Sequence, residues 1–156
     1  MLLNLLIMLF DLLKDIQSNL EDPCYLGKLP SKESIDAANG IYICLLSINE
    51  NAGIQRQDLQ IPDEHQNLCS LDLYIVVATY NSDYEEGLRA LDRVMRYFAD
   101  NTYHSLPTQG IYYTVQLANL SMEQNIILVQ SVLNVGQPGI IYKVSTAKRP
   151  EWTGDQ

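Results

Sequence analysis

The residues that could perform chemistry in this sequence are few and scattered. Two pairs of adjacent acids, Glu85-Glu86 and Asp63-Glu64, have the residue type used in general acid–base catalysis. Glu85-Glu86 opens a predicted helix, where carboxylates are stabilised by the positive end of the helix dipole. Asp63-Glu64 falls in a polar loop, and His104 is interpreted as a solvated side chain in another loop. We therefore predict no catalytic residue and no enzyme. The competing hypothesis is an enzyme whose site forms only in the folded chain, which would require a cleft that brings together His104, Tyr103 and an acid.

The cysteine and histidine residues do not form a metal-binding pattern. Cys24, Cys44 and Cys69 are isolated, without a C-x-x-C pair, and are expected to be reduced thiols. The two histidines, His65 and His104, are 39 positions apart, which gives little support for a zinc site. Walker, dinucleotide-binding, serine-hydrolase and zinc-protease motifs are also absent from the sequence. The sequence therefore predicts no metal and no cofactor.

One charge pattern is distinctive. Arg89, Arg93 and Arg96 are spaced four and three apart, so they share one face of a predicted helix. They can pair within the helix, because Glu85 precedes Arg89 and Asp92 precedes Arg96 by four positions. Alternatively, the three arginines meet an acidic neighbour, such as another copy of the chain. The sequence leaves both interpretations open.

Composition limits the possible partners. A chain of 156 residues with 47% hydrophobic content fits one globular domain, 1–156. Its net charge of −9 argues against nucleic acid and against an anionic membrane surface, because binding to phosphate requires clustered Lys and Arg. The apolar N-terminus lacks a small-residue cleavage site and is interrupted by Asp11, Lys14 and Asp15. We interpret it as a helix that stays in the protein.

The elements that position these residues are centred on the stretch 72–100. The run from Leu73 to Tyr80 is rich in aromatic and β-branched residues, which predicts a strand buried on both faces. Ser82 and Glu85 have capping-box spacing, which predicts the start of a helix. Apolar residues then recur every three or four positions and are expected to pack that helix on the strand: Tyr84, Leu88, Leu91, Met95 and Phe98.

Another helix is predicted from Leu2 to Leu20. One arc of about 120° is expected to face the core, and it holds Leu2, Leu5, Leu6, Leu9, Leu12, Leu13, Ile16 and Leu20. A separate stripe, formed by Leu3, Ile7 and Phe10, needs another cover. Either a further element of this chain or a neighbouring subunit provides it.

Three further strands are predicted at 41–49, 111–117 and 140–147, with a short edge strand near Tyr25-Leu26. A capping box at Ser121 and Gln124 predicts a helix over 121–135. The order α-β-β-α-β-α-β indicates an α+β fold, a mixed sheet of about four main strands with helices packed on it. Residues 50–70 are expected to form a mobile loop and 150–156 a polar tail. The last strand is expected to be a sheet edge that trails into Lys148 and Arg149.

Several blocks together resemble a known family. They are the leucine-rich N-terminal helix, IYICLLSINE, LYIVVATYNSDYEEGLRALDRVMRYFADN, IYYTVQLANLSMEQ and PGIIYKVSTAKR. Their order and spacing resemble the cap proteins of contractile injection systems, which are similar to the tail terminators of contractile phages. The resemblance covers nearly the whole chain, and none of its motifs is catalytic.

The resemblance implies a terminator-like fold and a hexameric ring that ends the tube and sheath and anchors the last sheath ring. The implied partners are further copies of the chain, the sheath protein and the inner tube protein. Such particles are made in the bacterial cytoplasm and act outside the cell or attached to its surface. The candidate contact residues are Leu3, Ile7, Phe10, Arg89, Arg93, Arg96, Lys148, Arg149 and Trp152. The alternative function is a small monomeric adaptor that binds a peptide at an exposed sheet edge.

Overall fold

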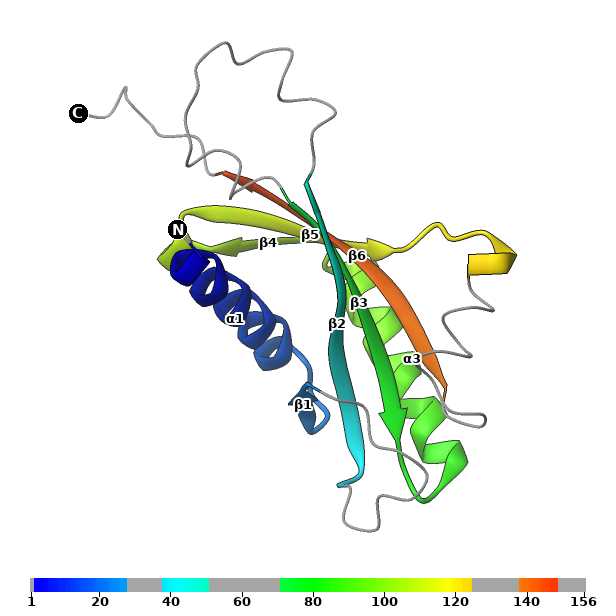
Figure 1. Ribbon diagram of the computed structural model, residues 1–156. Helices are drawn as coiled ribbons and strands as arrows, with labels where there is room; N and C mark the ends of the chain where they lie inside the picture. Colours follow the sequence, from blue (N-terminus) through cyan, green and yellow to red (C-terminus); the bar gives the residue numbers. More distant parts are fainter. Residues whose placement is uncertain (1, 28–37, 51–70, 125–137, 149–156) are drawn as a thin grey trace, which may run out of the picture.

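The computed structural model describes residues 2–27, 38–50, 71–124 and 138–148, and it shows one six-stranded mixed sheet with two long helices (Figure 1). The strands lie in the order β1-β2-β3-β6-β5-β4. The elements along the chain are α1 (Leu2–Asn19), β1 (Cys24–Leu26), β2 (Gly40–Glu50), β3 (Leu71–Tyr80), α3 (Tyr84–Asp100), β4 (Tyr103–Leu106), the 3-10 turn η1 (Pro107–Gln109), β5 (Ile111–Leu117) and β6 (Gly139–Lys148).

The α+β class is confirmed, but the strand count of about four is wrong. The four long strands lie where the sequence predicts them, and two short strands extend the sheet at its edges. The first, β1, is the short edge strand predicted near Tyr25-Leu26, and the structure shows that it pairs in parallel with β2. A Cβ on Gly40 would lie 2.5 Å from the Pro23 carbonyl oxygen, so a glycine is needed where β1 meets β2. The second, β4, replaces the loop that was predicted before Pro107.

The prediction that the last strand is a sheet edge is wrong. β6 lies between β3 and β5 and pairs antiparallel with both (Figure 1). Lys148 is the last residue of β6, and its backbone pairs with that of Ile111. Residues 149–156 lie outside the described residues, as does the loop predicted over 50–70, apart from Glu50, which ends β2. The predicted helix beyond Gln124 also lies outside them. The capping box at the start of that helix is present, because Ser121 and Gln124 each accept a hydrogen bond from the other's backbone N–H.

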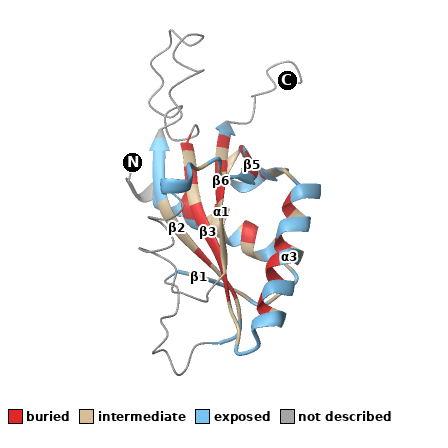
Figure 2. Ribbon diagram, turned by 90° about the vertical axis from the view of Figure 1, so that its right-hand side faces the viewer, coloured by how far each residue is buried: buried red, intermediate tan, exposed pale blue. Residues whose placement is uncertain are grey.

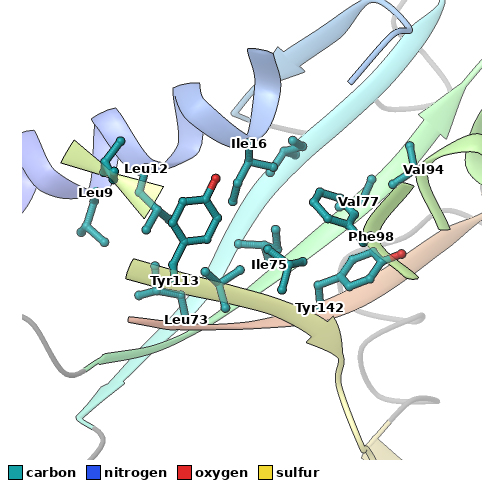
Figure 3. Packing of buried hydrophobic residues seen from close by; sticks show 14 of the residues in the cluster. Leu9, Leu12, Ile16, Leu73, Ile75, Val77, Val94, Phe98, Tyr113 and Tyr142 are labelled. Carbon is teal, nitrogen blue, oxygen red and sulfur yellow. The ribbon is translucent and has the colours of Figure 1, made fainter. Parts of the chain in front are cut away.

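Both helices pack on the same face of the curled sheet (Figures 1 and 2). In Figure 3 the α1 residues Leu9, Leu12 and Ile16 point toward the strands that carry Leu73 and Tyr113. Val94 and Phe98 from α3 complete the same hydrophobic cluster at its other end. No helix in the described part of the chain is long and apolar enough to span a bilayer.

The rotation of α1 differs from the prediction at Leu6, which is 51% exposed, whereas Met8 is buried. Asp11 accepts a hydrogen bond from the Gln109 side chain, and Asp15 accepts one from the Tyr113 hydroxyl. These bonds hold the acidic flank of α1 against the sheet. The buried arc therefore shifts toward Met8 and away from Leu6.

The apolar stripe predicted for α3 is only half correct. Leu91 and Phe98 are buried, but Tyr84, Leu88 and Met95 are exposed. The helix instead buries its small side, which includes Gly87, Ala90 and Val94. A Cβ on Gly87 would approach the Thr79 hydroxyl oxygen to 3.3 Å, so α3 lies close against β3. The close packing of α3 on β3 through small residues therefore decides which face of the helix is buried, and not the spacing of its large apolar residues.

The start of α3 also differs from the prediction. The N-cap is Asp83, whose carboxylate accepts a hydrogen bond from the Glu85 N–H at 3.1 Å, and not Ser82. We expect Asp83→Ala to lower the free energy of unfolding by about 1 kcal/mol through loss of the cap. Ser82→Ala is the matched control and should change it by no more than about 0.5 kcal/mol. Urea denaturation measures both, and equal losses would show that Ser82 contributes to the cap.

Candidate functional site

Among the described residues, Tyr103 and His104 do not converge on a common site. Tyr103 and His104 are neighbours on β4, so they point to opposite faces of the sheet. His104 stacks on the Tyr113 ring at 4.8 Å, and its Nε2 lies 2.7 Å from the Asn101 carbonyl oxygen. The expectation of a solvated His104 in a loop is therefore wrong. Tyr103 is 82% exposed on the other face, so no cleft joins the two.

The described thiols and acids form no reactive cluster. Burial raises the pKa of the Cys24 thiol to about 12 and also raises the pKa of Cys44, which keeps both as weak nucleophiles. In the ranges that the structure describes, no three His, Cys, Asp or Glu side chains lie close enough to hold a metal ion. A groove of about 270 Å³ lies between the end of α1 and α3, which is below the usual size of a small-molecule site.

The arginines of α3 do not act as one set. Arg89 pairs with Glu85 at 2.6 Å and Arg96 with Asp92 at 3.0 Å, which are the intrahelical pairs that the spacing allows. Both guanidiniums remain largely exposed. A role for them in partner contact stays a prediction.

Arg93 instead joins two parts of the fold. Its Nε and one terminal nitrogen donate to the two carboxylate oxygens of Asp22 at 2.9 and 2.8 Å, and Glu86 lies 3.3 Å away. The hydrogen bonds to Asp22 raise the pKa of Arg93. Asp22 lies between α1 and β1, so this bidentate pair fixes α3 against the α1–β1 connection.

We expect Asp22→Asn to lower the free energy of unfolding by about 1 kcal/mol, because it removes the charge from a partly exposed bidentate pair. The control is Glu85→Gln, which breaks an exposed intrahelical pair and should cost no more than about 0.5 kcal/mol. Thermal unfolding in low salt compares the two. An equal shift in both variants would contradict the internal role of Arg93.

The outer side of α1 carries an exposed apolar surface. Ile7 is 46% and Phe10 58% exposed, and Leu6 adjoins them, so no described element covers the stripe that the sequence identified. The Lys14 ammonium lies 5.3 Å from the centre of the Phe10 ring. The side chain of Leu3 lies outside the described residues. We use the name α1 outer stripe for Leu3, Ile7 and Phe10.

A second exposed surface is formed by β4 and β5, and it was not predicted from the sequence. Within the described ranges, β4 is the last strand of the sheet and has β5 as its one neighbour (Figure 1). The amino-acid composition of this segment does contain a signal for an exposed contact surface. Residues 101–122 contain no Asp, Glu, Lys or Arg, although these types make up 19% of the chain. Tyr103 of β4 and Tyr112 of β5 are exposed on one face of this pair of strands.

Comparison with known proteins identifies the fold. No family model and no curated protein matches the sequence. Among solved structures, the PVC sheath/tube terminator of an extracellular contractile injection system, in its extended state, is 15% identical over 90% of this chain, with a TM-score of 0.64. The tube-terminating cap of the anti-feeding prophage is 12% identical over 96%, with a TM-score of 0.58. The chain spans 59% and 56% of the lengths of these two proteins. The fold of this chain is therefore tail-terminator-like, as the resemblance implied.

Proposed function

We propose that the chain is a structural, non-enzymatic cap subunit of a contractile injection system. In this role it forms a hexameric ring at the end of the tube and sheath, stops their growth and anchors the last sheath ring. The observation that carries the proposal is the match of 90% of the chain to a sheath/tube terminator at a TM-score of 0.64. The proposed partners are further copies of the chain, the sheath protein and the tube protein of one particle. That particle would be assembled in a bacterial cytoplasm and act outside the cell or at its surface.

The exposed surfaces support assembly. A ring subunit needs two complementary contact areas, because its interfaces join different patches of neighbouring copies. The α1 outer stripe is an apolar area of this kind, with Ile7 and Phe10 exposed on the outside of the helix. We propose it as one half of the contact between subunits. Arg89 and Arg96 are further proposed contacts, whereas Arg93 is engaged within the fold.

The mass of the purified protein tests the ring. Light scattering at micromolar concentrations should give six times the 17.7 kDa of one chain. A mass of one chain across that range would contradict a ring formed by the protein alone and would favour the monomeric adaptor. The adaptor is not favoured at present, because both structural neighbours are terminators or caps.

A further inference from the structure

The β4 edge has open main-chain groups. Val115 donates its N–H to the Thr102 carbonyl oxygen at 3.0 Å, and the register places His104 opposite Tyr113. In an antiparallel pair, alternate residues turn their N–H and C=O toward the partner strand. The main-chain N–H and C=O of His104 therefore face β5. The main-chain N–H and C=O of Tyr103 and Ser105 point in the opposite direction, away from the sheet.

The opposite edge of the sheet is protected. At β1, the Gln17 side chain donates a hydrogen bond to the Cys24 carbonyl oxygen, so α1 occupies an outward group of that strand. In the part of the chain that the structure describes, no side chain bonds an outward group of β4, and the side chains of Tyr103 and Ser105 are exposed. Exposed edges are usually protected by charged residues, proline or a bulge. β4 has only its short length and the Pro107 that follows it.

The outer face of the sheet beside the edge is formed by uncharged side chains. Tyr103 and Ser105 lie on the outer face of the sheet opposite Thr114 and Tyr112, and the whole of 101–122 lacks charged residues. Charge depletion combined with exposed tyrosine is typical of the centre of protein interfaces. On this outer face, a partner is thus recognised through main-chain hydrogen bonds and apolar contact, not through charge.

We infer that the β4 edge receives an extended, uncharged segment of a different protein, which adds to the sheet as a seventh strand next to Tyr103 and Ser105. The added strand satisfies the N–H and C=O groups of both residues. Its side chains alternate between the outer face, beside Tyr103, and the inner face, beside His104. To pack beside Tyr103 and His104, the added strand needs neutral β-branched or aromatic residues.

A second copy of the chain is a poorer occupant than a different protein. Pairing of two β4 edges would give a closed two-fold dimer, in which the β4 edge of each copy is occupied by the other copy. Such a dimer does not continue into the proposed ring. The inference therefore rests on the proposed cap role for two points: the exclusion of a second copy, and the donor, which would be another protein of the particle.

Because the donor is unidentified, the experiment uses a phage-displayed library of random heptapeptides, selected on the purified full-length protein. Selected sequences should be uncharged, alternate β-branched or aromatic with small residues, and bind equally at low and high salt. Selection of predominantly charged sequences, or salt-sensitive binding, would overturn the inference. This result does not depend on the ring, whose failure is read separately from the mass of the protein.

Ser105→Pro removes one outward N–H and leaves the bonds between β4 and β5 in place. It should weaken a selected peptide by about tenfold or more, as expected for one unmade hydrogen bond. Ser105→Val is the matched control, which keeps the N–H and should bind within about twofold of the unmodified protein. Equal binding by the proline variant would overturn the inference.

A measurement on the unmodified protein covers the case in which Ser105→Pro disturbs β4. Amide hydrogen exchange should be fast at Tyr103 and Ser105 in the free protein, because their N–H groups point to solvent. A selected peptide should slow exchange at these two residues. Strand addition at β4 would be refuted if the peptide slowed exchange only in another part of the chain. It would also be refuted if the β4 strands of two copies paired with each other.

Discussion

Glutamate at both Ile7 and Phe10 is expected to convert the proposed ring into monomers without unfolding the subunit. Both side chains are about half exposed in the single chain, so the substitutions cost little within the fold. In a subunit contact they would bury unpaired carboxylates, each at several kcal/mol. Since 1.4 kcal/mol is tenfold in affinity, the dissociation constant between subunits should rise by about a hundredfold or more.

Light scattering of the double variant across micromolar concentrations measures the effect. The matched control is Ser82→Glu combined with Ala99→Glu, which adds the same charge at exposed positions on and beside α3. The control should keep the mass of the unmodified protein. A ring that survives glutamate at both Ile7 and Phe10 would remove the α1 outer stripe from the subunit contact.

Leu12→Ala is expected to have the largest effect on stability. Leu12 is 0% exposed in the cluster between α1 and the sheet (Figure 3). Removing its side chain leaves a cavity and should lower the free energy of unfolding by about 3 kcal/mol. Urea denaturation measures this, in the monomeric Ile7/Phe10 variant so that assembly does not contribute.

Leu6→Ala is the control for Leu12→Ala. The sequence pattern placed both leucines on the core face, whereas the structure leaves Leu6 half exposed. Truncation of Leu6 should therefore change the free energy of unfolding by no more than about 0.5 kcal/mol. Similar losses at the two positions would mean that α1 is rotated toward the predicted arc.

The long strands could be predicted because their sequence signal is local. β3 and β5 are runs of β-branched and aromatic residues bounded by turn residues, and β5 has the bounds predicted for it. The capping box at Ser121 and Gln124 was likewise visible as a four-residue pattern. Signals of this kind do not depend on which strands become neighbours.

Sheet order and helix rotation could not be predicted, because both depend on contacts between distant segments. The place of β6 between β3 and β5 follows from packing of the whole sheet. The rotation of α1 depends on Asp15, which meets Tyr113 far along the chain. The face that α3 buries depends on Gly87, which permits close approach to Thr79.

The candidate surfaces were partly predictable for the same reason. The α1 outer stripe is a periodic pattern within one helix, so Ile7 and Phe10 could be identified as surplus to the core. The different task of Arg93 depends on Asp22, which is distant in the sequence. The open edge at Ser105 became visible only once β4 was known to be the last strand.

Electron microscopy of tubes and sheaths assembled with the purified protein tests the cap role most directly. The proposal predicts six-fold rings at one end of the tube, distal to the baseplate, with the α1 outer stripe between neighbouring subunits. Tubes should also stop growing when the protein is added. Tube ends without added density, or protein bound singly along the sheath, would contradict the cap role.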